Sequence, residues 1–280
     1  MKLFYARLEK RQRRPICWKP GSSKLETENP LERWLAALDE RYLVNLTQSE
    51  VTRALRALSS CYVERREKLV SGGPLGSAGK RAAFALFYAP LHFLVTQHIV
   101  SALEAGAGVE RVLDLGCGTG SAGAAFAVQG SGLTVLGSRF TVNGVDRNAW
   151  AVAEANWTYR KLGISGRAAA GTIQKTPLHG GPGRAVLAAY AVNELPDVDR
   201  DGLLPRLLEA RRSGSRILII EPIARRLNRW WDGWNDAFTG AGGREDEWRF
   251  RVVLPPRQRS LAKAAGLDPQ ELTARTLYLQ

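Results

Sequence analysis

Residues Arg111–Gly123 read RVLDLGCGTGSAG, and the expected fold of the chain follows from this stretch. A short apolar run containing Asp114 leads into a turn with glycines at 116, 118 and 120, and small residues that can begin a helix follow. Glycine lets the backbone turn tightly and approach a ligand, because no Cβ stands in the way. The start of the next helix offers free N–H groups to a polar or anionic ligand. The stretch therefore predicts a strand, a nucleotide-type cofactor turn and a helix.

The glycines of this turn fit two cofactor motifs. Gly118, Gly120 and Gly123 spell G-x-G-x-x-G, the dinucleotide fingerprint. That frame starts two residues late, since the turn already begins at Gly116, and a carboxylate at Asp114 would repel a pyrophosphate. The frame D-L-G-C-G-T-G, which starts at Asp114, suits a cofactor that carries an ammonium group. We therefore favour the second frame.

Strand-like and helix-like segments alternate after the turn. The candidate strands are 112–115, 141–146, 168–173, 185–192, 216–220, 248–254 and 273–279. The candidate helices are 119–128, 149–162, 203–212, the tryptophan-rich segment 223–238, and 257–265. This alternation predicts an α/β fold with a doubly wound, mostly parallel sheet. Ligands of such sheets bind beyond the carboxyl ends of the strands, which is where Asp114, Asp146, Asn193 and Glu221 fall.

The chain before the turn divides into two further parts. Residues 1–30 form a basic arm and linker, residues 31–108 read as a helical region, and residues 109–280 form the cofactor-binding domain. The sequence TQSE at 47–50 is a capping box, so a helix should begin there. Further on, Arg81, Tyr88 and His92 are spaced by seven and four residues, which places them on one side of a helix. They could cover the cofactor or the target, or belong to an amphipathic cap helix; for His92 we favour the structural role.

Charge and composition narrow the function classes. The net charge of +13 favours contact with nucleic acid, although a general bias towards arginine would produce the same charge. No apolar run reaches the about 20 residues of a membrane span, so we expect no membrane contact. Cys17, Cys61 and Cys117 are scattered and show no metal-ligand spacing. We therefore expect no metal site and a reducing, cytoplasmic setting.

The frame D-L-G-C-G-T-G resembles motif I of the class I S-adenosylmethionine-dependent methyltransferases. This resemblance implies S-adenosyl-L-methionine as the cofactor and a Rossmann-like fold. It implies that Asp114 helps to hold the methionine end while the turn passes under the cofactor through Gly116, Gly118 and Gly120.

The same resemblance assigns roles to residues after later strands. Asp146 would accept hydrogen bonds from both ribose hydroxyls, and Thr172, together with Gln174, would lie near the adenine. Asn193–Pro196 (NELP) occupies the place of the Asn/Asp-Pro-Pro-aromatic motif of amino-group methyltransferases, without its second proline and aromatic residue. Asn193 could orient an amino group through its side-chain carbonyl, and Glu194 could act as a base. Asn193 and Glu194 are thus the catalytic candidates.

The chain also resembles the methyltransferase-like family associated with the small ribosomal subunit. The matching features are Arg81 and Tyr88, the segment AAYAVNELP at 188–196 and the segment ILIIEP at 217–222. This resemblance implies an RNA acceptor in the small ribosomal subunit and a methyltransferase activity. Two alternatives stay open. One is a small-molecule methyltransferase whose pocket is lined by the helix with Trp230 and Trp234, and the other is a non-catalytic ribosome-assembly factor that retains the cofactor fold.

Overall fold

The computed structural model describes residues 29–64, 75–131, 140–223, 229–267 and 271–280. The expected basic arm lies outside the described residues, except for its last two positions. At the capping box, the Thr47 hydroxyl accepts a hydrogen bond from the Glu50 N–H at 3.3 Å, and the Thr47 N–H donates to the Glu50 carboxylate at 2.8 Å. The helix expected there begins at Gln48, so the capping-box prediction is confirmed.

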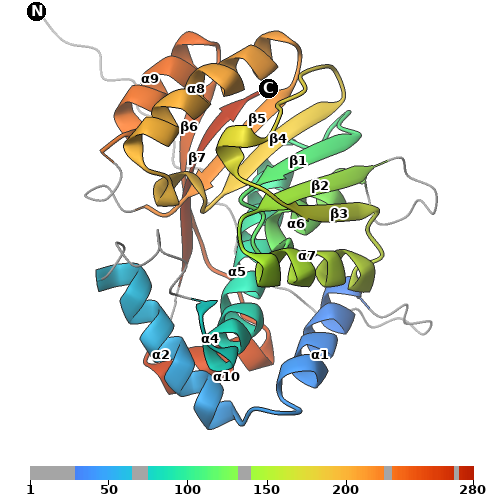
Figure 1. Ribbon diagram of the computed structural model, residues 1–280, viewed down its shortest axis with the longest axis vertical. Helices are drawn as coiled ribbons and strands as arrows, with labels where there is room; N and C mark the ends of the chain where they lie inside the picture. The colour runs from blue at the N-terminus through green and yellow to red at the C-terminus, as the bar shows by residue number, and fades with distance from the viewer. Residues whose placement is uncertain (1–28, 65–74, 132–139, 224–228, 268–270) are drawn as a thin grey trace, which may run out of the picture.

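A seven-stranded sheet with the order β3-β2-β1-β4-β5-β7-β6 forms the centre of the fold (Figure 1). The strands are β1 (Arg111–Leu115), β2 (Thr141–Asp146), β3 (Gly166–Ala170), β4 (Arg184–Ala189), β5 (Arg216–Glu221), β6 (Arg244–Phe250) and β7 (Leu272–Leu279). Strands β1 to β5 are parallel, and β7 lies antiparallel between β5 and β6. The predicted doubly wound, mostly parallel sheet is therefore confirmed.

Helices cover both faces of this sheet. They are α1 (Pro30–Tyr42), α2 (Gln48–Glu64), α4 (Ala78–Ala83), α5 (Ala89–Ala102), α6 (Ser121–Ser131), α7 (Ala149–Lys161), α8 (Asp197–Arg212), α9 (Trp231–Gly240) and α10 (Pro256–Ala265). Because side chains along a strand point alternately to opposite faces of the sheet, β5 contributes side chains to two hydrophobic clusters. Leu218 and Ile220 pack in the cluster that includes α5 and α6, whereas Ile217 and Ile219 pack in the cluster that includes α8 and α9.

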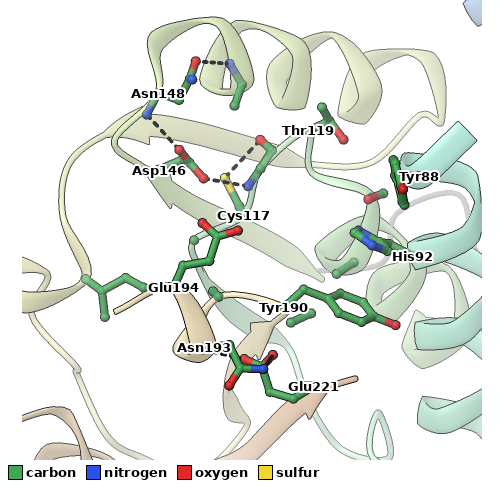
Figure 2. A pocket seen from close by; sticks show the side chains of 18 of the residues that line it. Tyr88, His92, Cys117, Thr119, Asp146, Asn148, Tyr190, Asn193, Glu194 and Glu221 are labelled. Atoms are coloured by element: carbon green, nitrogen blue, oxygen red, sulfur yellow. Dashed lines mark hydrogen bonds between the residues drawn. The ribbon is translucent and has the colours of Figure 1, made fainter. Parts of the chain in front are cut away.

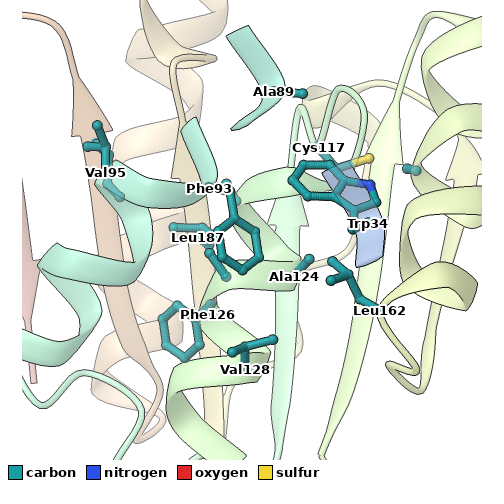
Figure 3. Packing of buried hydrophobic residues seen from close by; sticks show 14 of the residues in the cluster. Trp34, Ala89, Phe93, Val95, Cys117, Ala124, Phe126, Val128, Leu162 and Leu187 are labelled. Atoms are coloured by element: carbon teal, nitrogen blue, oxygen red, sulfur yellow. The ribbon is translucent and has the colours of Figure 1, made fainter. Parts of the chain in front are cut away.

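The first hydrophobic cluster joins the N-terminal helices to the sheet. Trp34 of α1 lies with its ring centroid 5.6 Å from that of Phe93 of α5, and both side chains are almost completely buried. Figure 3 shows Phe93 beside Phe126 of α6 and Leu187 of β4. Each such side chain stabilises the fold by roughly 1.5–3 kcal/mol when fully buried. The helical region and the sheet thus share one core.

The helical stretch Ala78–Ala102 contains a π-helical segment, Phe84–Tyr88, between α4 and α5. Pro90 has no N–H, so it cannot donate to the Leu86 carbonyl four residues earlier. Gln258 of α10 donates to that carbonyl instead, through Nε2 at 2.8 Å, and its side chain is buried. This contact explains why α10 lies beside α2 and the π-helical segment, away from the strands that flank it in sequence (Figure 1).

The same stretch, Ala78–Ala102, is long and apolar enough to cross a membrane by length and composition, since a window of 18 residues within it has a mean hydropathy of 1.4. Within that window 61% of the stretch is buried inside the protein. Its apolar residues therefore pack mostly against the protein, as those of a core helix do.

Some element boundaries differ from those expected. β3 ends at Ala170, and a short 3-10 turn begins at Ile173. The side chain of Ile173 packs in the second hydrophobic cluster. α8 begins at Asp197, six residues before the expected start, because the acidic residues of its first turn suit the positive end of a helix. β6 begins at Arg244 because an edge strand tolerates charged side chains in solvent.

Candidate active site

The turn between β1 and α6 is built on glycines with positive φ. Gly116, Gly118 and Gly120 have φ values of 68°, 51° and 77°, in the left-handed region that favours glycine. A Cβ at Gly116 would lie 2.6 Å from the Cβ of Ala191, and one at Gly120 would lie 2.9 Å from Cε1 of Tyr159. A Cβ at Gly118 would meet no atom within 4 Å. Two glycines therefore permit close packing, and Gly118 borders open space.

Asp146, the last residue of β2, binds the turn directly. Its Oδ2 accepts a hydrogen bond from the Gly118 N–H at 2.9 Å, and its Oδ1 accepts one from the Asn148 N–H at 2.8 Å. Asn148 in turn caps α7, since its side chain accepts from the N–H groups of Trp150 and Ala151. The carboxylate that was expected to hold ribose thus lies against the glycine turn, with its position fixed by two backbone donors (Figure 2).

A cavity of about 810 Å³ opens at the carboxyl ends of the strands. Gly116, Gly118, Asp146 and Thr172, all expected to bind the cofactor, line it, and the first turn of α6 contributes Ser121. Gly120 does not line the cavity; it packs against Tyr159 and Ala155 instead.

Asp114, which was expected to help hold the methionine end of the cofactor, does not line the cavity either. Its side chain is 1% exposed and lies beneath the turn, where Oδ2 accepts a hydrogen bond from the Gly123 N–H at 3.0 Å. Burial, with a smaller effect from nearby Asp146, raises the pKa of Asp114 from 3.8 to about 7. Asp114 therefore supports the first turn of α6 from below.

The segment after β3 is held in place by α8. Nη1 of Arg206 donates to the carbonyl oxygens of Ile173 and Gln174 at 3.2 and 3.1 Å, and Nη2 donates to the carbonyl of Thr176. Gln174 also donates to Asp199 at 2.6 Å. Thr172, Ile173 and Gln174 all line the cavity. Arg206 of α8 thus fixes the cavity wall where adenine was expected. The sequence did not indicate this role, because it depends on a contact between α8 and the segment after β3.

The two catalytic candidates differ in how they are held. Asn193 donates from its backbone N–H and from Nδ2 to the two carboxylate oxygens of Glu221, at 3.0 and 2.7 Å. Its side-chain carbonyl accepts from Nε1 of Trp230 at 2.9 Å. That carbonyl, which was expected to orient an amino group, is thus already engaged within the protein.

Glu194 is half-buried and lines the cavity. Figure 2 shows its carboxyl group directed towards the side of the cavity formed by the turn and Asp146. Asn193 also lines the cavity, but its side-chain carbonyl is bonded to Trp230, so Glu194 is the stronger candidate for a base.

Aromatic rings form the cavity wall opposite the turn. Phe84, Tyr88 and His92 come from the π-helical segment and α5, and Tyr190 follows β4. The rings of His92 and Tyr190 stack with centroids 4.0 Å apart and an interplanar angle of 17°. Enclosure in the cavity lowers the pKa of His92 from 6.5 to about 4, so its imidazole is neutral at neutral pH.

Two expectations about aromatic and basic residues need correction. Arg81 does not share this wall, because the π-helical segment changes the helical register; its guanidinium bonds to the Leu75 carbonyl and lies 5.7 Å from the Trp150 ring centroid. Trp231 and Trp234 are buried in the second hydrophobic cluster and do not line the cavity. The sequence did not indicate that Tyr190 lines the cavity, because AAYAV has the composition of an ordinary strand, whereas Tyr190 has a φ of 59°.

Comparisons with known proteins add a family match. Residues 112–214 match the family described as "Methyltransferase domain". No curated protein sequence matches the chain.

Three solved structures of low identity are similar to the chain. Magnesium protoporphyrin IX methyltransferase from Synechocystis PCC 6803 with bound SAM has 13% identity and a TM-score of 0.46, over 80% of this chain and 95% of that chain. A SAM-dependent methyltransferase from Aquifex aeolicus has 17% identity and a TM-score of 0.43, over 68% and 91%. A TehB-like SAM-dependent methyltransferase from Corynebacterium glutamicum has 15% identity and a TM-score of 0.42, over 79% and 97%.

The cavity suits S-adenosylmethionine. Its volume of about 810 Å³ falls towards the upper end of small-molecule sites, roughly 300–1,000 Å³, and leaves room for an acceptor. Open space lies where a side chain at Gly118 would project, and the carboxylate of Asp146 borders the cavity for hydroxyl donors. With the family match over residues 112–214, these features indicate that the chain contains an S-adenosylmethionine-dependent methyltransferase domain.

Proposed function

We propose that this methyltransferase acts on RNA of the small ribosomal subunit. The observation that carries the proposal is the net charge of +13, because RNA presents a phosphate to every nucleotide and attracts basic proteins. The resemblance of the AAYAVNELP and ILIIEP segments to the small-subunit-associated family supports the choice of ribosomal RNA.

The distribution of charge near the cavity supports contact with a polyanion. Helix α2 contributes Ser59 to the cavity and carries the exposed Arg53. The neighbouring helix α10 carries the exposed Arg259 and Lys263. Cations on these two packed helices would bind phosphates beside the cavity without reading sequence.

The residues of the chain supply positioning for the transfer. When bound, S-adenosylmethionine supplies a methyl group on a positively charged sulfur. The turn at Gly116 and Gly118, with Asp146, would hold this cofactor, which would give up the methyl group to an acceptor lone pair while sulfur keeps the bonding electron pair. Such a displacement depends mainly on holding the acceptor, methyl group and sulfur in line. Glu194 can take the proton that a nitrogen or hydroxyl acceptor loses, because its carboxyl group lines the cavity.

Methyl transfer from radiolabelled cofactor onto three samples in parallel tests the proposal: total RNA, small ribosomal subunits and a small-molecule extract. Asp146→Ala, which lacks the carboxylate beside the turn, is the cofactor-site control. Label in RNA that depends on Asp146 supports the proposal. Label in the small-molecule extract alone contradicts it and selects a metabolite acceptor. Cofactor binding without transfer to any sample also contradicts it and selects the non-catalytic assembly factor.

A further inference from the structure

The cavity contains more wall than the cofactor residues account for. The turn and the ends of β2 and β3 form one part. The other part is formed by Phe84, Tyr88, His92 and Tyr190, together with Asn193 and Glu221. A methyl acceptor has to meet the methyl group inside the same cavity, so this second part is the region available to it.

The second part of the cavity is a connected set of rings. Phe84 lies 6.0 Å from His92 in an edge arrangement, and Tyr88 lies 6.2 Å from His92. His92 in turn stacks on Tyr190 at 4.0 Å. Flat rings gain favourable stacking and edge contacts from such a wall, whereas a flexible aliphatic chain gains only contact area. The geometry favours a planar ligand.

Tyr190 is held in a backbone conformation that a residue with a side chain rarely adopts. Its φ of 59° lies in the left-handed region, and its N–H donates to the Ile220 carbonyl at 2.8 Å, which ties the residue to β5. Residues kept in such conformations cluster at functional sites, because the strain persists only where the surroundings impose it. Here the conformation places the phenol ring against His92.

His92 is a polar group within this apolar wall. Among the described residues, none forms a hydrogen bond with its imidazole, which is half-buried and lines the cavity. A neutral imidazole has one N–H donor and one acceptor nitrogen. A ligand that covers the imidazole without pairing with it would leave its donor and acceptor unsatisfied, so a ligand that pairs with it gains specificity.

We propose that the acceptor enters this part of the cavity as a planar heteroaromatic ring, and that His92 hydrogen-bonds to that ring. The proposal rests on the methyltransferase activity and deepens the proposed function. If the acceptor is RNA, the ring is a base turned out of its stack, and the methyl group goes to the base and not to the ribose. A free heteroaromatic metabolite has the same ring chemistry.

His98 provides a matched control for His92. Both lie on α5, and His98 stacks on Phe250 with centroids 4.0 Å apart and an interplanar angle of 21°, but it does not line the cavity. His92→Phe keeps a ring beside Tyr190 and removes both nitrogens. His98→Phe makes the same chemical change outside the cavity.

The test combines the position of the label with the two variants. Labelled RNA is digested to nucleosides, and the methyl group is located on base or ribose by mass spectrometry. We expect label on a base, an at least tenfold loss of transfer in His92→Phe, less than twofold loss in His98→Phe, and unchanged affinity of both variants for S-adenosylhomocysteine by calorimetry. Unchanged cofactor affinity shows that His92→Phe is folded.

Each other outcome separates this proposal from the RNA proposal. Label on ribose leaves the RNA acceptor standing and overturns the planar-ring proposal. Label only in a free heteroaromatic compound overturns the RNA acceptor and supports the ring. Label only in an aliphatic compound overturns both. Equal effects of the two variants on transfer also overturn the planar-ring proposal.

If no sample is labelled, saturation-transfer NMR of S-adenosylhomocysteine-loaded protein with free nucleosides decides. A nucleoside signal that disappears in His92→Phe and persists in His98→Phe supports the planar-ring proposal. The absence of any nucleoside signal with the wild type overturns it.

Discussion

At the scale of single residues, the cofactor turn depends on glycine for two different reasons. Gly116 and Gly120 leave no room for a Cβ, whereas Gly118 leaves open space on the cavity side. The left-handed conformation costs a residue with a side chain roughly 1–2 kcal/mol. At Gly118 an added methyl group would also project where the cofactor is expected, so the two costs can be measured separately.

Gly118→Ala and Gly108→Ala form a pair for that measurement. Gly108 also has a positive φ, of 71°, and a Cβ there would also meet nothing within 4 Å, but Gly108 does not line the cavity. We expect both variants to lose about 1–2 kcal/mol of unfolding free energy in urea. Only Gly118→Ala should lose affinity for S-adenosylmethionine, by at least tenfold in calorimetry. Equal affinity in the two variants would show that the turn does not contact the cofactor at Gly118.

The buried carboxyl group of Asp114 predicts a pH dependence of stability. Burial raises its pKa from 3.8 to about 7 in the folded protein. The folded protein therefore holds this proton more tightly than the unfolded chain does. The stabilising contribution is complete below the ordinary pKa of 3.8 and is lost as the pH rises through about 7.

Asp114→Asn tests this dependence, since the amide stays uncharged and its oxygen can still accept from the Gly123 N–H. Relative to the wild type, the variant should be more stable at about pH 8 than at about pH 5, because only the wild type loses a proton in between. Urea unfolding at both pH values measures the difference. A stability difference that is the same at both would contradict the buried, protonated state of Asp114.

At the scale of elements, the wall near the expected adenine position is a short segment without ladder hydrogen bonds of its own. The 3-10 turn that follows β3 is held by Arg206 of α8 through the carbonyls of Ile173, Gln174 and Thr176. A guanidinium group can hold several carbonyls at once because its donors are fixed in one plane. The position of this wall therefore depends on α8, which packs in the same hydrophobic cluster as Ile173.

Arg206→Ala should loosen the wall and weaken S-adenosylmethionine binding about threefold to tenfold, with a smaller effect on methionine, which has no adenine. Arg212→Ala is the control: it lies on the same helix, is exposed, and pairs with Glu209. Calorimetric titrations with both ligands provide the measurement. Equal weakening for S-adenosylmethionine and methionine would assign Arg206 a purely structural role.

The elements also show what could be predicted from the sequence. The stretch 111–123 contained the local signals for strand, turn and helix, and β2 was predicted at its observed bounds because its apolar run ends in Asp146. The starts of β6 and of α8 were missed, because their charged residues have no apolar periodicity and only the sheet edge and the helix dipole accommodate them.

Residues whose position depends on distant contacts could not be predicted. The burial of Asp114 under the turn follows from how α6 packs on β1. The pairing of Asn193 with Glu221 and Trp230 brings together segments 28 and 37 residues apart. The aromatic wall needed the π-helical segment, which in turn depends on Pro90 and on Gln258. No local spacing in the sequence signals these contacts.

At the scale of the whole molecule, the cavity lies between a sheet and a layer of helices that share one hydrophobic core. Exposed cations on α2 and α10 lie in that helical layer. Because binding to phosphates releases counterions, affinity for RNA should fall steeply with salt. The net charge of +13 and the exposed cations on these helices thus predict an affinity for RNA that depends on salt concentration.

Fluorescence anisotropy with labelled small-subunit RNA at increasing salt tests this prediction. The Arg53→Ala, Arg259→Ala double variant should bind more weakly than the wild type and with a smaller salt slope, by about one to two ion equivalents. Arg212→Ala, on the opposite face of the sheet, should behave as the wild type does. Binding that does not change with salt would contradict an RNA substrate held by phosphate contacts.

We expect the glycine turn at 116–120 to hold S-adenosylmethionine and not a dinucleotide, the other cofactor that its glycine spacing allows. Calorimetric titration of the wild type and Asp146→Ala with S-adenosylmethionine and with NAD⁺ tests it most directly. We expect one S-adenosylmethionine bound per chain, an at least tenfold loss of affinity in Asp146→Ala, and no NAD⁺ binding. NAD⁺ binding in place of S-adenosylmethionine, or no binding of either, would contradict it.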